Sequence, residues 1–342
     1  MTTTSSSSTG SLLQVENLCI DVTLVGGKKT VPAVRDVSFQ VEAGEAVGLV
    51  GESGSGKSLT LRTILGILPN GVRATSGRVI FEGVDLLKAP KRTVNRLRGT
   101  GITMIFQEPM TSLNPIAKVG EQIVDAARAK HSWSKGEARE HALSLARHMG
   151  IPDPENTLSL YPHELSGGLR QRVMIAAALA CQPKLVLCDE PTTALDVTIQ
   201  AQIIRLLVQL KDELGMSMLY VTHDLAVVAQ LCQRLEVMYA GSIVESGLVS
   251  DVFRRPDHPY TQGLARATPD VDAVVDQLTG IRGNAPTLGN WPQGCAFHPR
   301  CDYATDECRT GNFPLRETST GRASACIHID RLHESMAKEG SR

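Results

Sequence analysis

The chain of 342 residues lacks any apolar run near the roughly 20 residues that a membrane-spanning helix needs. The longest apolar candidate, Val173–Cys181, is about half that length and is typical of a buried helix. Net charge is also nearly absent, because 35 basic residues stand against 36 acidic residues. This balance gives no electrostatic reason to expect nucleic acid as a partner.

A secretory signal is missing from the N-terminus as well. Residues 1–11 are polar and of low complexity, with no basic residue and no apolar core, and they predict a disordered tail. We therefore expect the protein to stay in the cytosol, where disulfides are rare. That setting favours a metal over disulfides for the cysteines that cluster near the C-terminus.

A phosphate-binding loop is predicted in the first quarter of the chain. Gly51–Ser58 fits the pattern G-x-x-x-x-G-K-S, between an apolar strand-like run and a helical pattern. Backbone N–H groups and the helix N-terminus would bind phosphates, Lys57 would reach the β- and γ-phosphates, and Ser58 would ligate Mg²⁺. A glycine-rich turn that binds nothing is the alternative, and the strand–turn–helix context favours the phosphate site. The candidate nucleotide-binding residues are Gly51, Glu52, Ser53, Gly54, Ser55, Gly56, Lys57, Ser58 and Leu59.

An acidic pair follows a second apolar run. Leu185–Cys188 predicts a buried strand, and Asp189 and Glu190 come at its end. The carboxyl ends of parallel strands face the ligand crevice of an α/β sheet. We expect Asp189 to hold Mg²⁺ and Glu190 to polarise the water that attacks the γ-phosphate. A solvated strand end is the alternative, and the preceding phosphate loop makes it the weaker one.

Two further stretches complete a family pattern. With "LSGG" at Leu165–Gly168 and "LYVTHD" at Leu219–Asp224, residues 12–265 resemble the ATP-binding-cassette (ABC) ATPases. The resemblance implies an α/β fold: a P-loop NTPase core, an antiparallel β subdomain, and a helical signature subdomain at about 108–180. A small loop-rich C-terminal extension would span residues 266–342. The corresponding family motifs are the Q-loop glutamine Gln107, the signature Leu165–Gly168, the D-loop Ala194–Asp196 and the switch histidine His223.

The resemblance also implies roles for individual residues. Two cassettes would dock head to tail, with ATP between the P-loop of one and Ser166, Gly167 and Gly168 of the other, although Ser166 alone reads as a helix cap. No aromatic precedes Phe39 in Asp21–Phe39, so Val31 is the candidate to pack against adenine. Catalysis is assigned to Glu190, His223 and Gln107, and Mg²⁺ binding to Ser58, Gln107 and Asp189.

Three segments narrow the resemblance to the dipeptide, oligopeptide and nickel importers: Ile105–Pro115, Arg254–Ala265 and the cysteine-bearing stretch after Gly294. This implies a peripheral ATPase at the cytoplasmic face of the membrane that energises peptide uptake. Its partners would be two transmembrane permease subunits, a second ATPase subunit (a paralogue or a copy) and an extracytoplasmic substrate-binding protein. Helices at about Val119–Met149 would meet a permease. The alternatives are a nickel or haem-type importer, an exporter cassette, a soluble non-transport ABC ATPase and a degenerate cassette that only binds ATP.

The clustered cysteines lie in this last segment. Their spacing lacks the paired C-x₂-C knuckles of a structural zinc site. Four thiolates from a loop-rich tail suit a [4Fe–4S] cluster, as in some members of the importer group, with zinc or a metal-free knot as the alternative. The four predicted ligands are Cys295, Cys301, Cys308 and Cys326. The other cysteines, which are expected to be buried as small hydrophobic residues, are Cys19, Cys181, Cys188 and Cys232.

Overall fold

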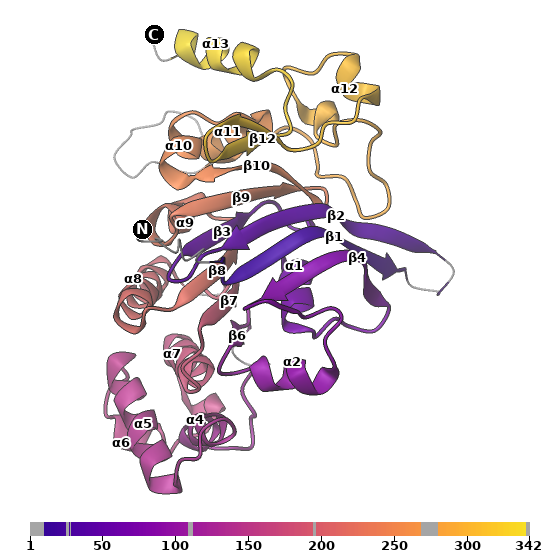
Figure 1. Cartoon of the computed structure of the whole chain (residues 1–342). Coiled ribbons are helices and arrows are strands. Elements are labelled where there is room, and N and C mark those ends of the chain that lie inside the picture. Colours follow the sequence, from indigo (N-terminus) through magenta and orange to yellow (C-terminus); the bar gives the residue numbers. More distant parts are fainter. Residues whose placement is uncertain are drawn as a thin grey trace, which may run out of the picture.

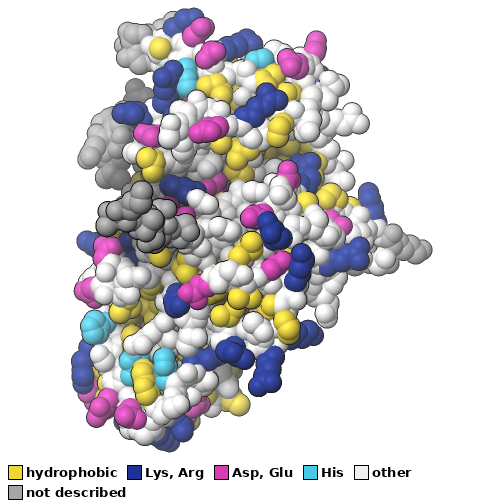
Figure 2. All heavy atoms as spheres, in the orientation of Figure 1, with side chains coloured by type: hydrophobic (Ala, Val, Ile, Leu, Met, Phe, Trp, Pro, Cys, Tyr) yellow, Lys and Arg dark blue, Asp and Glu magenta, His cyan; other side chains and the backbone are white. Residues whose placement is uncertain are grey.

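The computed structural model describes residues 10–24, 27, 29–108, 112–193, 196–267 and 280–339. Residues 1–9 of the expected N-terminal tail lie outside this description. Among the described helices, none is both long and apolar enough to cross a membrane. Basic and acidic side chains are interspersed over the face drawn in Figure 2, in keeping with the nearly balanced charge of the sequence.

The main sheet has eight strands in the order β11-β12-β10-β9-β3-β8-β7-β6. Its central strands are parallel, and they are short apolar runs because both of their faces are covered. All of these strands therefore end at the same edge of the sheet. The parallel strands are β6 (Ile102–Ile105), β7 (Leu185–Asp189), β8 (Ser217–Thr222), β3 (Ala46–Val50) and β9 (Arg234–Tyr239).

The two faces of this sheet belong to two hydrophobic cores. Leu49 and Leu187 pack in the core shared with the antiparallel sheet and α1 (Lys57–Leu65). Val50 and Cys188, one residue further along each strand, pack in the core on the other face. That core is closed by α8 (Val197–Leu214) and α9 (Leu225–Leu231). The alternation of strand side chains thus fixes which residues face which layer.

A smaller antiparallel sheet has the order β2-β1-β4-β5 and lies beside the P-loop half of the core (Figure 1). Its apolar residues alternate with exposed ones in β2, as expected when one face is covered and the other meets solvent. A short helix, α2 (Lys91–Leu97), leads from this sheet to β6. The strands are β1 (Leu13–Thr23), β2 (Thr30–Val41), β4 (Val72–Phe81) and β5 (Val84–Asp85).

A helical lobe lies at the opposite end of the molecule from the C-terminal residues (Figure 1). It begins after residue 112, and its second helix starts with a capping box in which Ser134 and Glu137 satisfy each other's backbone N–H groups. The lobe contains α4 (Val119–Arg128), α5 (Lys135–His148), α6 (Pro154–Thr157), η1 (Pro162–Glu164) and α7 (Gly167–Leu179).

The C-terminal residues are bonded to the main sheet and do not stand apart from it. β12 pairs with β10, with Glu245 opposite Ser324. The buried carboxylate of Glu245 accepts the backbone N–H groups of Asp257 and His258 at 2.7 and 2.9 Å. The elements from β10 onward are β10 (Ser242–Leu248), α10 (Val249–Arg254), α11 (Pro259–Ala267), η2 (His298–Arg300), α12 (Glu307–Thr310), β11 (Arg316–Ser319), β12 (Arg322–Ser324) and α13 (Ile329–Glu339).

His258→Asn should reduce the loss of stability in weak acid. His258 is 2% exposed, and burial lowers its pKa from 6.5 to about 3. Because the folded-state pKa lies below the unfolded-state value, the stability that neutral His258 contributes is present above pH 6.5. It is lost progressively as the pH falls from there towards 3. An asparagine oxygen can accept the backbone N–H of Tyr260 that Nδ1 accepts at 3.1 Å. Between pH 7 and pH 5, the wild-type protein should lose about 2 kcal/mol more unfolding free energy than the variant.

Denaturant unfolding at the two pH values measures this difference. Glu236 and Glu245, whose pKa values burial raises to about 7, change stability in the opposite direction but are present in both proteins. His148→Asn is the control, because His148 is exposed on α5. An equal loss of stability in wild type and His258→Asn would contradict the prediction.

Candidate nucleotide-binding site

The predicted P-loop forms the turn between β3 and α1. Two glycines in it are required by close packing: a Cβ on Gly51 would lie 2.0 Å from the backbone oxygen of Met238, and a Cβ on Gly56 would lie 2.8 Å from Met238 Cε. Gly56 also has a φ of 106° and is the residue before the first turn of α1. The turn is therefore packed against the end of β9, and its residues Gly51–Leu59 lead directly into the helix N-terminus.

Lys57 occupies the inside of this turn. Its side chain is 5% exposed, and Nζ donates to the backbone oxygens of Gly51 at 2.6 Å and Glu52 at 3.0 Å. Burial lowers the pKa of Lys57, and the nearby carboxylates of Glu190 and Asp189 oppose this effect. Nζ also lies 3.9 Å from the Glu190 carboxylate. An ammonium held here can turn from backbone carbonyls to phosphate oxygens.

Two of the three candidate Mg²⁺ ligands, Ser58 and Asp189, are hydrogen-bonded to each other. Ser58 Oγ donates to Asp189 Oδ1 at 2.7 Å, although the two residues are 131 positions apart in the chain. Burial raises the pKa of Asp189, while the Ser58 hydroxyl and Arg62 lower it. A hydroxyl and a carboxylate at this spacing are the oxygen ligands that Mg²⁺ takes, so these residues fit the ion. Gln107 lies exposed just after β6, the next strand after β7 in the sheet.

Glu190 and His223 form a second pair at the same edge. His223 Nδ1 lies 3.1 Å from Glu190 Oε2, and Thr193 Oγ1 donates to the same oxygen at 3.0 Å. Glu190 has a φ of 45°, a strained value for a residue with a side chain. Sequence reasoning missed Thr193, because a threonine in a turn carries no signal of its own.

The signature residues lie at the start of α7, in the helical lobe. Ser166 precedes α7, and its side chain accepts the N–H of Leu169 at 3.4 Å, as an N-cap does. Ser166 and Gly167 are exposed, and Gly168 packs towards α8, where a Cβ would meet Ile199 Cγ2 at 3.2 Å. Of the D-loop, Ala194 and Leu195 lie outside the described residues, and Asp196 caps α8 through the N–H of Ile199 at 2.9 Å.

Val31, the candidate for the base, is 3% exposed in β2. Gly289 packs on it so closely that a Cβ there would lie 2.8 Å from Val31 Cγ1. The contact between Val31 and adenine stays a prediction.

Arg300, from the C-terminal part of the chain, contacts the P-loop residue Glu52, and the sequence around Arg300 did not predict this contact. Arg300 Nη1 and Nη2 donate to the carboxylate of Glu52 at 2.7 and 3.0 Å. Burial by itself lowers the pKa of Arg300, but the hydrogen bonds to Glu52 and Tyr239 raise it above the ordinary value. Tyr260, from the segment Arg254–Ala265, accepts the backbone N–H of Glu52 at 2.7 Å. Glu52 was predicted as a nucleotide-binding residue, but these partners were not.

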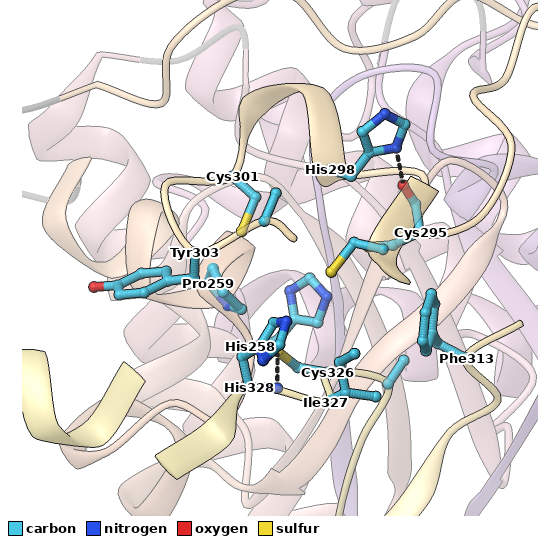
Figure 3. Close-up of a pocket in the computed structure, with 13 residues that line it drawn as sticks. His258, Pro259, Cys295, His298, Cys301, Tyr303, Phe313, Cys326, Ile327 and His328 are labelled. Carbon is cyan, nitrogen blue, oxygen red and sulfur yellow. Dashed lines mark hydrogen bonds between the residues drawn. The ribbon is translucent and has the colours of Figure 1, made fainter. Parts of the chain in front are cut away.

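The four clustered cysteines line one small cavity at the C-terminal end. Figure 3 shows Cys295 and Cys301 turning their sulfur atoms towards the same space, with His258, His328 and Cys326 nearby. The cavity holds about 20 Å³, which is room for about one water molecule and far too little for eight iron and sulfide atoms. Burial raises the pKa of Cys301 to about 11 and that of Cys326 to about 12.

The iron–sulfur prediction is therefore wrong. Within the described part of the chain, no group of three or more His, Cys, Asp or Glu side chains is arranged to hold a metal ion. The set Cys295, Cys301, Cys308 and Cys326 does not fit a [4Fe–4S] cluster, and zinc has no such group there either. Of the other cysteines, Cys181, Cys188 and Cys232 are buried and Cys19 is half-buried.

A phosphate loop, an acidic pair and a histidine at one edge of a parallel sheet define a P-loop nucleoside triphosphatase. Residues 34–193 match the ABC transporter family, and residues 244–308 match the family described as the C-terminal region of the oligopeptide/dipeptide transporter. The chain is 48% identical over 299 residues to the dipeptide transport ATP-binding protein DppD of Haemophilus influenzae, covering 87% of this chain and 90% of that protein. It is 46% identical over 316 residues to the oligopeptide transport ATP-binding protein OppD of Escherichia coli, covering 92% and 93%.

Solved structures give the same fold. A dimeric ATP-binding cassette in a post-hydrolysis state, bound to ADP and Pi, aligns with a TM-score of 0.62 and 28% identity over 69% of this chain and 98% of that one. The protein cbiO1 of Clostridium perfringens, part of the ABC transporter complex cbiONQ, aligns with a TM-score of 0.60 and 28% identity over 71% and 91%.

The chain belongs to the ABC transporter family, among the ATP-binding proteins of dipeptide and oligopeptide transporters. The expected α/β cassette fold and the role as ATPase subunit of a peptide ABC importer are confirmed by these matches. Membership implies ATP and Mg²⁺ as the bound nucleotide and ion. The relatives are components of membrane transport systems, and this chain supplies no spanning helix among its described residues.

Lys57→Met should weaken binding of MgATP by roughly ten- to a hundredfold, because it removes a charged donor to the phosphates. Isothermal titration of the purified chain with MgATP measures the dissociation constant. Lys184→Met is the matched control, since the Lys184 side chain is 58% exposed, forms an ion pair with Glu82 and lies at the opposite end of β7 from Asp189. Unchanged affinity in Lys57→Met would remove Lys57 from the phosphate site.

Proposed function

We propose that this chain binds and hydrolyses ATP to energise the uptake of dipeptides or oligopeptides across the cytoplasmic membrane. The observation that carries this proposal is the convergence of the Lys57, Ser58–Asp189 and Glu190–His223 groups at the carboxyl edge of the parallel sheet. The names of the relatives favour peptides as cargo over nickel or haem-like ligands.

The site residues divide the work of phosphoryl transfer to water. Backbone N–H groups of Gly51–Leu59 and the Lys57 ammonium bind the phosphates and neutralise their charge. Ser58, Asp189 and Gln107 would hold Mg²⁺, which supplies further positive charge at the phosphates. Glu190 takes the proton of the attacking water, and His223, held 3.1 Å from Glu190, orients that water against the γ-phosphate.

A second cassette completes the site. Ser166, Gly167 and Gly168 are exposed or half-exposed at the start of α7, in the helical lobe. They can offer a hydroxyl, backbone N–H groups and a helix N-terminus to ATP bound by a partner. The partner is a paralogue or a second copy of this chain. Hydrolysis therefore requires two paired cassettes.

The helical lobe is the surface for a permease. Twelve positions of the chain separate Gln107 from the start of α4 at Val119, so a residue expected near the γ-phosphate is joined to the lobe by one short segment. We place two permease subunits and an extracytoplasmic substrate-binding protein in the same complex, with this chain at the cytoplasmic face. In this assignment residues 12–265 form the ATPase domain, with 108–180 as its helical subdomain, and residues 266–342 form the C-terminal extension.

Glu190→Gln should keep ATP binding but lower turnover roughly 100-fold or more, because the amide cannot accept the water proton. Phosphate release by the assembled transporter gives turnover, and retained radiolabelled ATP gives binding. Glu213→Gln, an exposed acid at the end of α8, is the control and should hydrolyse ATP at the wild-type rate. Near-normal turnover in Glu190→Gln would end its assignment as the base.

Cysteines placed at Ser112 or Asn114 should crosslink to a permease subunit. Both residues are exposed in the segment between Gln107 and α4. A short bifunctional maleimide added to the whole complex, followed by identification of the joined chains, reads out the neighbour. Glu334→Cys on α13, at the far end of the molecule in Figure 1, should give no permease adduct. Crosslinks from 112 and 114 that reach only the second ATPase would overturn the placement.

A further inference from the structure

Glu52, the second residue of the P-loop, is held by groups from distant parts of the chain. Its backbone N–H donates to Tyr260 Oη at 2.7 Å, and its carboxylate accepts both terminal nitrogens of Arg300. Its backbone oxygen accepts Lys57 Nζ at 3.0 Å. Arg300 lies 248 positions from Glu52, so the phosphate loop is tied to the C-terminal extension through one residue.

Contacts other than Glu52 also hold the guanidinium of Arg300 in place. Arg300 is 9% exposed, its Nε donates to the backbone oxygen of Arg282 at 2.8 Å, and Nη1 also reaches Tyr239 Oη at 3.3 Å. The planar fork of arginine matches a carboxylate with two parallel hydrogen bonds, which lysine cannot do. The pair is therefore directional as well as charged.

Aromatic packing makes this connection rigid. The Tyr239 and Tyr260 rings lie 4.6 Å apart, and Phe297 lies 5.3 Å from the first and 5.4 Å from the second. Tyr260 and Phe297 are almost fully buried, at 0% and 3% exposed. Phe297 and Arg300 both belong to the short segment between Cys295 and Cys301. A shift of that segment would therefore change the contacts that hold Glu52 in the P-loop.

The charge of Glu52 makes the arginine necessary. A P-loop has to accept the negative triphosphate, and an uncompensated carboxylate within the loop would repel it. The side chain of Glu52 is 27% exposed, so solvent screens it only in part. The bidentate contact with Arg300 neutralises this carboxylate where it stands.

We propose that Arg300 is a positioning residue for nucleotide binding, and that through it the C-terminal segment around residues 295–301 sets the affinity of the cassette for ATP. Arg300 cancels the charge of Glu52 and, together with Tyr260, keeps the P-loop in its phosphate-accepting shape. This inference rests on the proposed function, because it assumes that the P-loop binds ATP.

Titration of the full-length chain with MgATP tests the proposal. Arg300→Met should raise the dissociation constant roughly tenfold, because Glu52 is left charged beside the phosphates. Glu52→Gln should raise the dissociation constant less than Arg300→Met does, since the amide places no negative charge beside the phosphates. The double variant Arg300→Met/Glu52→Gln should bind nearly as well as Glu52→Gln alone. Arg300→Lys, which keeps the charge but loses the fork, should fall between wild type and Arg300→Met.

The double variant separates this role from a purely structural one. It lacks the packing and hydrogen bonds of Arg300 just as Arg300→Met does, so a structural defect would persist in it. In the assembled transporter, Arg300→Met should raise KM with kcat close to wild type, the pattern of lost uniform binding. Arg309→Gln is the control, because the Arg309 side chain is 66% exposed and forms an ion pair with Asp306 at 3.4 Å.

Each outcome decides one question. A wild-type chain that binds MgATP together with an Arg300→Met variant of equal affinity would overturn the inference and leave the proposed function standing. A wild-type chain that binds no better than Lys57→Met would overturn the proposed function itself. If Arg300→Met does not fold, Arg300→Lys must still raise the dissociation constant, and adding Glu52→Gln must remove that increase. A double variant as weak as Arg300→Met would also contradict the proposal.

Discussion

The register of the parallel strands is the constraint on which the site depends. Val50 stands opposite Thr222, and Asp189 stands opposite Val221, so three strand ends are level with one another. The phosphate turn, the acidic pair and His223 follow these ends directly. A slip of one residue in any strand would reverse the faces of its side chains and move its catalytic group away from the others. The apolar composition of β3, β7 and β8, buried on both faces, holds this register.

The site concentrates features that a stable protein otherwise avoids. Lys57 is buried, Glu190 has a left-handed backbone, and a carboxylate lies in the loop that must receive phosphates. Strain and buried charge of this kind cost free energy, and they persist only where the surroundings over-determine the geometry. Here the two hydrophobic cores on either face of the main sheet supply that rigidity.

The parts of the site that sequence reasoning found are those encoded by short segments. The P-loop, Asp189–Glu190 and His223 each combine an apolar strand with the residues that follow it, and parallel strands bring such ends together. The Arg300–Glu52 contact had no such signal, because an arginine among cysteines and prolines does not reveal a partner 248 positions away.

The cysteine prediction failed for a related reason. Spacing shows that thiols share a segment, but it shows neither the space between them nor whether the fold arranges them around one point. Helices α4 and α5 lie within Val119–Met149, where helices were expected, whereas β11 and β12 are too short and polar to be recognised as strands.

The pairing of β12 with β10 has a consequence for solubility. Without that hairpin, β10 would end the main sheet with unpaired backbone N–H and C=O groups along a largely buried strand. Such an edge is a template for pairing with another chain. The hairpin replaces it with β11, which has four residues, all exposed, including Arg316 and Glu317. A short charged outer strand resists edge-to-edge association, so the C-terminal extension also protects the cassette against aggregation.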